Sequence, residues 1–373
     1  MKFETLSIHA GRDVEQHTGS VAPPMYLSTT FERDVDGEYS RGYSYARADN
    51  PSRRDVERCI AALEGGAEAT SYSSGSAASM AVFSLLRPGD HVVAPVECYH
   101  GTAKQLRDVL APMGVTHSFV DMTRVDGVRE ALRDNTRLVW IETPSNPMLN
   151  ISDIAAIADL AHGRGAIVCC DNTFATPVWQ RPFELGADLV MHSSTKYFGG
   201  HSDLMGGAVV SRDRGGLSDK LRDYQATAGS VPSPFDCWLL RRSLTTLACR
   251  VRAQTHNATL LANYLQDHKK VERVFYPGLE SHPGHAIAQR QMKGGYGAML
   301  SFCVRGGRDE AFAVVARTQL FTRATSLGGV ESLIEHRAST EGPHTVTPQN
   351  LLRVSVGLES AEDLIADLEH ALG

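Results

Sequence analysis

The sequence predicts an α/β protein, in which a mainly parallel sheet flanked by helices is followed by a smaller C-terminal α+β domain. Up to about residue 240, short unbroken apolar runs alternate with helical runs, as in parallel sheets that are buried on both faces. One of these apolar runs leads directly into Asp171, and another is followed, after His-Ser-Ser-Thr, by Lys196, and both residues are suited to chemistry. Ligands of such sheets bind at the carboxyl ends of the strands, so we expect the two side chains to share a site.

Three parts are expected along the 373 residues. Residues 1–48 are rich in Gly, Pro, Ser, Thr and Tyr and have little apolar periodicity, which predicts an irregular arm that packs against something else. Residues 49–240 form the sheet domain, and residues 241–373 form the smaller domain.

In the sheet domain the first helix is expected to begin at Asn50 and Pro51, a capping residue and a first-turn proline, and to end at Gly65. Further helices are expected at residues 101–111 and 153–162. The strands are expected at six apolar runs, residues 91–96, 116–120, 138–141, 166–170, 189–191 and 208–210.

The pattern changes near residue 240. A long helical stretch is expected from residue 235 to about residue 269. It is followed by strands at 298–302 and 351–356 and by helices at 309–320 and 361–372. This mixture lacks the regular alternation of the first domain and therefore predicts an α+β domain.

Composition excludes several classes of protein. The net charge of −6 and the absence of a dense basic run argue against a nucleic-acid partner. No apolar stretch approaches the ~18 residues of a membrane helix, and the polar N-terminus lacks a secretory signal. Seven cysteines without a Cys-x-x-Cys motif fit the reduced thiols of a cytoplasmic protein. His282 and His285 have no acidic or thiol partner at ligand spacing, so no metal site is expected.

Lys196 and Asp171 together predict a site for pyridoxal phosphate. The lysine amine can form a Schiff base with the aldehyde of this cofactor, and the aspartate can keep its pyridinium nitrogen protonated. The hydroxyls of Ser193 and Thr195 can donate to its phosphate. Each residue alone is also compatible with an ordinary solvated loop, so the prediction depends on their combination at two strand ends.

Other residues extend this hypothesis, although each has a structural alternative. Gly75 and Ser76 open a helical run, where free backbone N–H groups can bind a phosphate. Tyr99 could stack on the cofactor ring or move protons, and Asn146 could bind the phenolic oxygen or simply form a turn. Arg353 lies in an apolar strand, where it either binds a substrate carboxylate or occupies the exposed face.

A series of motifs resembles the cystathionine γ-synthase/γ-lyase family, the pyridoxal-phosphate enzymes of cysteine and methionine metabolism. They occur in order from about residue 3 to the C-terminus. The motifs are residues 45–51, 73–75, 142–147, 171–173, 192–197, 200–203, 326–332 and 352–359. The resemblance implies the fold type I transferase architecture, with a mainly parallel sheet of the seven-stranded type.

The resemblance also implies roles for individual residues. Lys196 would carry the Schiff base and, with Tyr99, the protons. Tyr45 and Arg47 would reach the phosphate of a neighbouring subunit in a homotetramer, a dimer of dimers with shared active sites. The implied cofactor-binding residues are Lys196, Asp171, Gly75, Ser76, Ser193, Thr195, Tyr99, Thr173, Tyr45 and Arg47. The implied substrate-binding residues are Arg353, Ser326, Asn146, Thr325, Lys104 and Arg337.

The chain departs from the family pattern in the distal substrate pocket. Thr325 stands where enzymes acting on cystathionine usually carry Glu, and Lys104 stands where Arg is frequent. Residues 336–343, which include Arg337, replace a Met-Thr-His segment. These changes are expected to alter which leaving group is recognised.

The implied reaction is γ-elimination, a C–S or C–O lyase activity on an amino acid such as cystathionine that gives a 2-oxo acid and ammonia. Residues 231–236 look more like the γ-lyases. Two alternatives stay open: γ-replacement with an O-acylhomoserine, and a γ-lyase specialised for another amino acid such as canavanine. A different class, the penicillin-interacting serine enzymes, matches Ser193-x-x-Lys196 formally, but the chain has no Lys-Thr-Gly motif.

Overall fold

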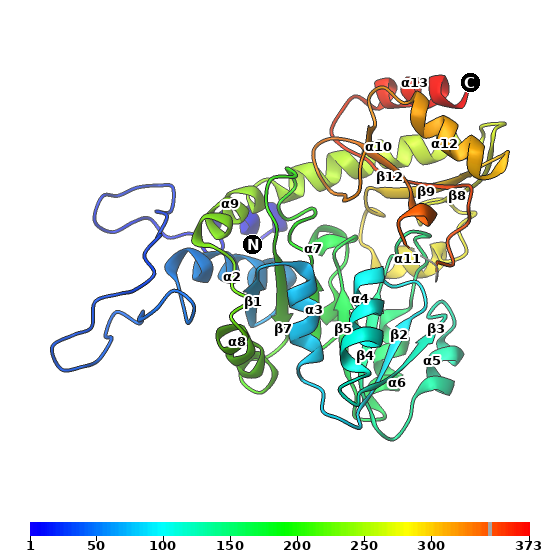
Figure 1. The fold of residues 1–373 in the computed structure, drawn as a ribbon. Helices are drawn as coiled ribbons and strands as arrows, with labels where there is room; N and C mark the ends of the chain where they lie inside the picture. Colours follow the sequence, from blue (N-terminus) through cyan, green and yellow to red (C-terminus); the bar gives the residue numbers. More distant parts are fainter. Residues whose placement is uncertain (342–344) are drawn as a thin grey trace.

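The computed structural model describes residues 1–341 and 345–373 and contains two sheets (Figure 1). Within these residues the larger sheet has seven strands in the order β1-β7-β6-β5-β4-β2-β3, and the smaller has five in the order β10-β11-β12-β9-β8. The predicted α/β class with a second, smaller α+β part is confirmed.

The larger sheet is parallel except for one strand, β7, which runs antiparallel to both of its neighbours. Its strands are β1 (Glu68–Tyr72), β2 (His91–Pro95), β3 (Thr116–Val120), β4 (Thr136–Glu142), β5 (Ile167–Asp171), β6 (Leu189–His192) and β7 (Gly207–Ser211). All six predicted strands are present. The prediction missed β1, because Glu-Ala-Thr-Ser-Tyr is too polar to stand out as an apolar run.

Helices lie on both faces of this sheet (Figure 1). They are α2 (Pro51–Glu64), α3 (Gly75–Phe83), α4 (His100–Lys104), α5 (Val125–Ala131), α6 (Ile154–His162), α7 (Thr176–Trp179) and α8 (Leu217–Ala228). Helix α2 begins and ends as predicted, since Asn50 accepts a hydrogen bond from Ser52 N and Gly65 adopts a φ of +80°. The predicted helix at 101–111 is instead α4 followed by a π-helical turn, Gln105–Leu110.

The C-terminal part combines the smaller sheet with helices. Its strands are β8 (Val271–Phe275), β9 (Met299–Val304), β10 (Thr322–Arg323), β11 (Leu333–His336) and β12 (Leu351–Ser355). Its helices are α9 (Pro234–Leu244), α10 (Leu247–Gln266), α11 (His285–Gln291), α12 (Gly307–Arg317) and α13 (Ala361–Leu372). No helix in the described part of the chain is long and apolar enough to cross a bilayer.

The long helical stretch predicted from residue 235 is present as two helices, α9 and α10, with a short break between them. Thr245 and Thr246 lie at the break, and their hydroxyls donate to the carbonyls of Arg242 (2.6 Å) and Ser243 (3.1 Å). Threonine hydroxyls that bond nearby carbonyls compete with regular helical hydrogen bonding. Beyond the break, α10 runs across the molecule toward the smaller sheet (Figure 1).

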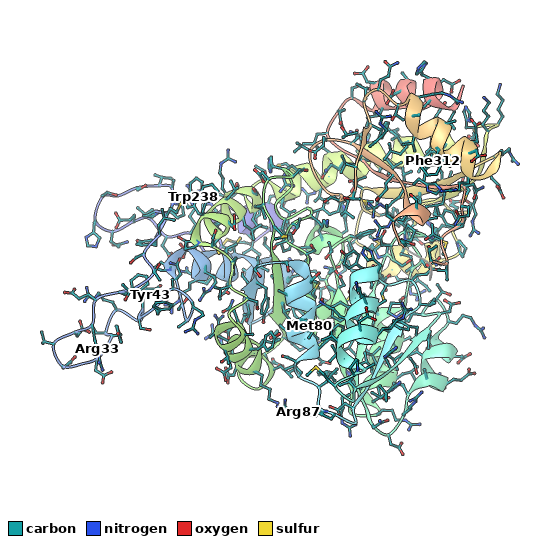
Figure 2. The ribbon with its side chains drawn as sticks, in the orientation of Figure 1. Arg33, Tyr43, Met80, Arg87, Trp238 and Phe312 are labelled. Atoms are coloured by element: carbon teal, nitrogen blue, oxygen red, sulfur yellow. The ribbon has the colours of Figure 1, made fainter. Side chains whose placement is uncertain are left out.

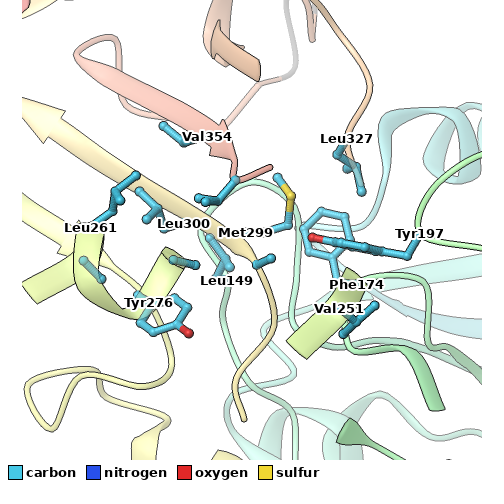
Figure 3. Close-up of a cluster of buried hydrophobic side chains, with 14 of the residues drawn as sticks. Leu149, Phe174, Tyr197, Val251, Leu261, Tyr276, Met299, Leu300, Leu327 and Val354 are labelled. Atoms are coloured by element: carbon cyan, nitrogen blue, oxygen red, sulfur yellow. The ribbon is translucent and has the colours of Figure 1, made fainter. Parts of the chain in front are cut away.

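A continuous apolar core joins the two parts of the chain. Figure 3 shows Tyr197 and Phe174 from the larger domain packed near Met299 and Val354 of the smaller sheet. Helix α10 lies along this junction, and its Arg250 donates to the Tyr197 carbonyl at 2.8 Å. The segment that carries Lys196 is therefore fixed against both domains.

The N-terminal arm is irregular apart from one short helix, α1 (Phe3–His9), which the sequence did not predict. The following loops stand away from the body, and Figure 2 shows Arg33 and Tyr43 on them. Several apolar side chains on the arm are exposed, among them Val14, Leu27 and Val35. An exposed apolar surface of this kind is typical of a segment that contacts another protein surface.

Candidate active site

One cavity of about 480 Å³ lies between the carboxyl ends of the parallel strands and the smaller domain. It brings together most of the predicted site residues. These are Gly75, Ser76, Tyr99, Asn146, Asp171, Thr173, Ser193, Thr195, Lys196, Thr325, Ser326, Arg337 and Arg353. Three predicted residues, Tyr45, Arg47 and Lys104, do not line it.

Lys196 follows β6 and extends its amine into the cavity. Its Nζ donates to the hydroxyl of Ser326 at 2.9 Å. Burial, together with the guanidinium groups of Arg353 and Arg337, lowers the pKa of Lys196 to about 8. The uncharged amine, which is the form that acts as a nucleophile or a base, therefore forms at a lower pH than in an ordinary lysine.

Asp171 is the last residue of β5 and lies opposite Glu142 of β4. Its Oδ1 accepts a hydrogen bond from the backbone N–H of Thr173 at 3.0 Å. Burial raises the pKa of Asp171, whereas the bonds from Thr173 and the nearby His192 act in the opposite direction. A carboxylate in this position needs a cation, and a protonated pyridine nitrogen in the cavity would provide it.

Glu142 is a site residue to which sequence reasoning assigned no role. Its Oε2 accepts from the backbone N–H of Tyr99 at 2.7 Å. Burial and the neighbouring Asp171 raise the pKa of Glu142 well above its ordinary value, which favours the protonated form of this carboxyl group. Glu142 thus holds the Tyr99 backbone in place beside Asp171.

A phosphate-sized cradle lies at the start of α3. Ser74 caps this helix by accepting from Ala77 N at 3.0 Å, and the first N–H groups of α3 are free to bind an anion. A Cβ atom on Gly75 would lie only 2.8 Å from the Cβ and Oγ of Ser193. Only glycine lets the helix end and the Ser193 segment approach this closely, and Thr195 lies on the same segment. These residues fit the phosphate of pyridoxal phosphate.

Arg353 occupies the opposite end of the cavity on β12. Its guanidinium donates to Asn146 Oδ1 (3.1 Å), to the Ser326 carbonyl (3.0 Å) and to Glu335 Oε2 (2.7 Å). The side chain is only 4% exposed, so the alternative of an arginine on the exposed face is wrong. Burial lowers its pKa to about 10, and the group still carries its charge at neutral pH, where it can bind a carboxylate.

Arg337 forms part of the distal wall together with Thr325 and Thr340. It donates to Glu335 Oε2 at 3.2 Å and to Glu341 Oε1 at 2.9 Å. Glu335 therefore joins the two buried arginines of the cavity. Within the predicted segment 336–343, Gly342 and Pro343 lie outside the described residues.

His100 lines the cavity as well and was missed at the sequence level. Its position directly after Tyr99 was the available signal. Its ring lies 4.5 Å from the Tyr99 ring, between centroids, and its Nδ1 lies 3.2 Å from Nη2 of Arg337.

The three remaining predicted residues lie outside the cavity of this chain. Tyr45 is 45% exposed on the arm, and Arg47 donates to the Ala226 carbonyl at 2.6 Å. Lys104 ends α4 with an exposed side chain. Among the residues that the structure describes, no cluster of three potential metal ligands occurs.

The fold and this cavity define a pyridoxal-phosphate enzyme, with a lysine of lowered pKa, a buried aspartate and a phosphate cradle around one space. Comparison with known proteins agrees. The family model described as Cys/Met metabolism PLP-dependent enzyme matches residues 4–373. The chain belongs to this family.

Individual relatives resemble the chain over almost its whole length. A cystathionine gamma-synthase of Mycobacterium tuberculosis is 48% identical over 99% of this chain and 96% of its own. A cystathionine gamma-lyase of Dictyostelium discoideum is 45% identical over 100% of this chain and 97% of its own. The crystal structure of metB from Corynebacterium glutamicum superposes with a TM-score of 0.97 at 43% identity, covering 100% of this chain and 98% of that one. Membership of the family rules out the serine-enzyme alternative.

Proposed function

We propose that the protein catalyses γ-elimination on a γ-substituted amino acid such as cystathionine, giving a 2-oxo acid and ammonia. One observation carries the proposal: the Lys196 amine, with a pKa of about 8, lies between the phosphate cradle and the buried Arg353. The elimination needs a single base that reaches two neighbouring carbons of an anchored amino acid.

Different residues of the chain bind the substrate, transfer the protons and position the cofactor. Bound pyridoxal phosphate supplies an electron sink that acidifies protons near the amino group. Arg353 binds the substrate carboxylate, which fixes Cα and Cβ relative to Lys196. Lys196 Nζ takes the proton from Cα, gives that proton up again, and is then free to take the proton from Cβ as the γ substituent leaves. The Ser326 hydroxyl at 2.9 Å keeps the amine in place between these steps. Tyr99, whose backbone is placed by Glu142, would cover the ring of the bound cofactor.

A second candidate is γ-replacement, in which a thiol takes the place of the γ substituent. The 48% identity to mycobacterial cystathionine gamma-synthases favours it. A γ-lyase for another amino acid, such as canavanine, is favoured by Thr325 and Arg337 on the distal wall. Both use the same proton transfers by Lys196.

Release of 2-oxo acid from a substrate panel tests the proposal. The panel contains cystathionine, O-acetyl- and O-succinylhomoserine, homocysteine, methionine and canavanine, each with and without cysteine. Elimination predicts 2-oxobutanoate without added thiol, whereas replacement predicts a new thioether only when cysteine is present. Lys196→Ala should abolish both, and a wild-type protein that releases no product from any member would overturn the proposal.

We further propose a homotetramer in which each arm completes a neighbour's site through Tyr45 and Arg47. The exposed apolar arm supports this assembly. Sedimentation of the intact protein gives the subunit number. Mixing inactive Arg47→Ala with inactive Lys196→Ala should restore activity through hybrid sites. No recovery of activity would contradict the sharing of active sites between subunits.

We also propose a cytoplasmic location. The seven free cysteines, six of them buried, support it.

A further inference from the structure

The side chains of His100 and Arg337 meet at the distal wall of the cavity. They come from α4 and from the turn after β11, and Arg337 Nη2 lies 3.2 Å from His100 Nδ1. A guanidinium can only donate hydrogen bonds. His100 Nδ1 must therefore be the nitrogen without a proton, and the ring proton resides on Nε2.

Arg337 is itself held firmly, so it fixes the ring of His100. It is buried, and it donates to Glu335 at 3.2 Å and to Glu341 at 2.9 Å. The positive charge beside Nδ1 opposes a second proton on the imidazole. Burial and Arg337 lower the pKa of His100, with a smaller contribution from Lys104, while Glu341 and Glu335 oppose this shift. The ring is neutral and is a donor through one atom only.

His100 Nε2 has no hydrogen-bond partner among the residues that the structure describes, and the ring lines the cavity beside Tyr99. The acidic residues that line this cavity, Glu142 and Asp171, both lie at the cofactor end. Among the residues that the structure describes, the distal wall thus offers an N–H donor and no lining carboxylate for a cationic group.

We propose that His100 and Arg337 act as a specificity pair, in which Arg337 orients His100 and the His100 Nε2–H donates to an acceptor oxygen on the γ substituent. This inference rests on the proposed function and names the class of leaving group: an oxygen-bearing acyl, carboxyl or oxyamine group, in preference to a bare alkyl thioether. A site built around a donor discriminates strongly against analogues that lack the acceptor. His100 and Arg337 are here specificity-determining residues, since Lys196 carries the protons.

Two substitutions distinguish the roles of the two ring nitrogens of His100. His100→Gln places an amide N–H near the position of Nε2 and retains the donor to the substrate. His100→Asn places its amide near the position of Nδ1, so it keeps a partner for Arg337 but offers no donor to the substrate. The measured quantity is the ratio of kcat/KM for O-acetylhomoserine to kcat/KM for methionine.

The wild-type ratio is expected to fall by about tenfold or more in His100→Asn and in Arg337→Met, but by less than about threefold in His100→Gln. Equal ratios in the Gln and Asn variants would overturn the role of His100 and Arg337 in specificity and would leave the proposed function intact. Absence of any 2-oxo acid from wild-type protein would instead overturn the proposed function, and this inference with it. Cofactor absorbance verifies that each variant is folded and loaded.

A second readout needs neither cofactor nor turnover. Hydrogen–deuterium exchange at the imidazole C2, followed by mass spectrometry, reports the pKa of His100 in the cofactor-free protein. Arg337→Met should move this pKa upward, toward the ordinary histidine value. A pKa that does not respond to Arg337→Met would overturn the assigned contact.

Discussion

The Lys196 amine donates a 2.9 Å hydrogen bond to the hydroxyl of Ser326, a residue whose backbone is held at a φ of +84°. A side chain is strained in this left-handed region, and such strain persists only where surrounding contacts maintain it. The Ser326 carbonyl accepts from Arg353 at 3.0 Å, and Gly328 N donates to Ser355 Oγ at 2.8 Å. The strained residue thus directs its hydroxyl to Lys196 and its carbonyl to Arg353.

Two substitutions of Ser326 should distinguish the effect of the backbone strain on stability from the effect of the hydrogen bond on activity. Ser326→Ala and Ser326→Gly both remove the hydroxyl, so both are expected to lower kcat/KM by about tenfold. Only glycine adopts a positive φ without cost, so the Gly variant should be the more stable by about 1 kcal/mol. Urea unfolding of the cofactor-free variants measures this difference, and equal stability would contradict backbone strain at this position.

The pKa of Lys196 should make the stability of the cofactor-free protein depend on pH. This pKa is lowered from 10.5 to about 8 in the folded chain. Between these two values the unfolded chain binds more protons at Lys196 than the folded chain does, so the free energy of unfolding rises with pH across this window. The cost of burying the charged amine is fully present below pH ~8 and corresponds to about 3 kcal/mol.

Lys196→Met isolates this effect, because the other titrating groups are common to both proteins. At pH ~7 the Met variant should be the more stable, and its advantage should shrink as the pH approaches ~10. Denaturant unfolding at several pH values gives the two free energies. An advantage that stays constant over this range would mean that the Lys196 pKa is not lowered.

Arg353 is expected to bind the carboxylate that all amino-acid substrates share. Arg353→Lys keeps the charge but loses the fork of donors that reaches Asn146, Ser326 and Glu335. KM should rise by about 10- to 100-fold for every substrate, whatever its γ substituent. Steady-state kinetics on two substrates with different leaving groups measures this. A rise confined to one of them would place Arg353 at the leaving group instead.

Gly75 is expected to be indispensable for cofactor retention. In Gly75→Ala the new methyl group would lie 2.8 Å from Ser193, so the phosphate cradle must open. The affinity for pyridoxal phosphate should fall by about tenfold or more, whereas Ser76→Ala, which keeps its backbone N–H, should change it by less. Equilibrium dialysis monitored by cofactor absorbance compares the two variants. Unchanged retention in Gly75→Ala would argue against a phosphate at α3.

The parallel sheet was predictable because its central strands are unbroken apolar runs, and the Asp171 and Lys196 ends follow directly from them. Strand β11 was not predictable in the same way, since Leu-Ile-Glu-His mixes apolar and charged residues. Its Glu335 is buried beside Arg337, two residues further on, and beside Arg353 of the neighbouring strand β12. Burial of this kind depends on tertiary partners, which no local pattern reveals.

The contacts of the distal wall could not be predicted either, because they also depend on tertiary partners. Arg353 could be read from its strand as either buried or exposed, and only the pairing of β12 between β9 and β11 decides between these. His100 and Arg337 are 237 residues apart in the chain, and nothing in either neighbourhood predicts their contact. Residues that follow strand ends were therefore within reach of sequence reasoning, whereas partners brought together by two domains were not.

Helix α10 hydrogen-bonds to both sides of the cavity. Arg250 donates to the Tyr197 carbonyl, next to Lys196, and Gln254 donates to the Gly329 carbonyl at 2.6 Å, near Ser326. Asn257 donates to the Gly357 carbonyl at 3.2 Å, just beyond the strand of Arg353. These bonds attach one helix to the segments that carry Lys196, Ser326 and Arg353, so the distance between Lys196 and Arg353 is fixed. We expect a fixed distance to admit amino acids that differ beyond Cγ and to exclude a β-amino acid, which has one extra carbon before its carboxylate.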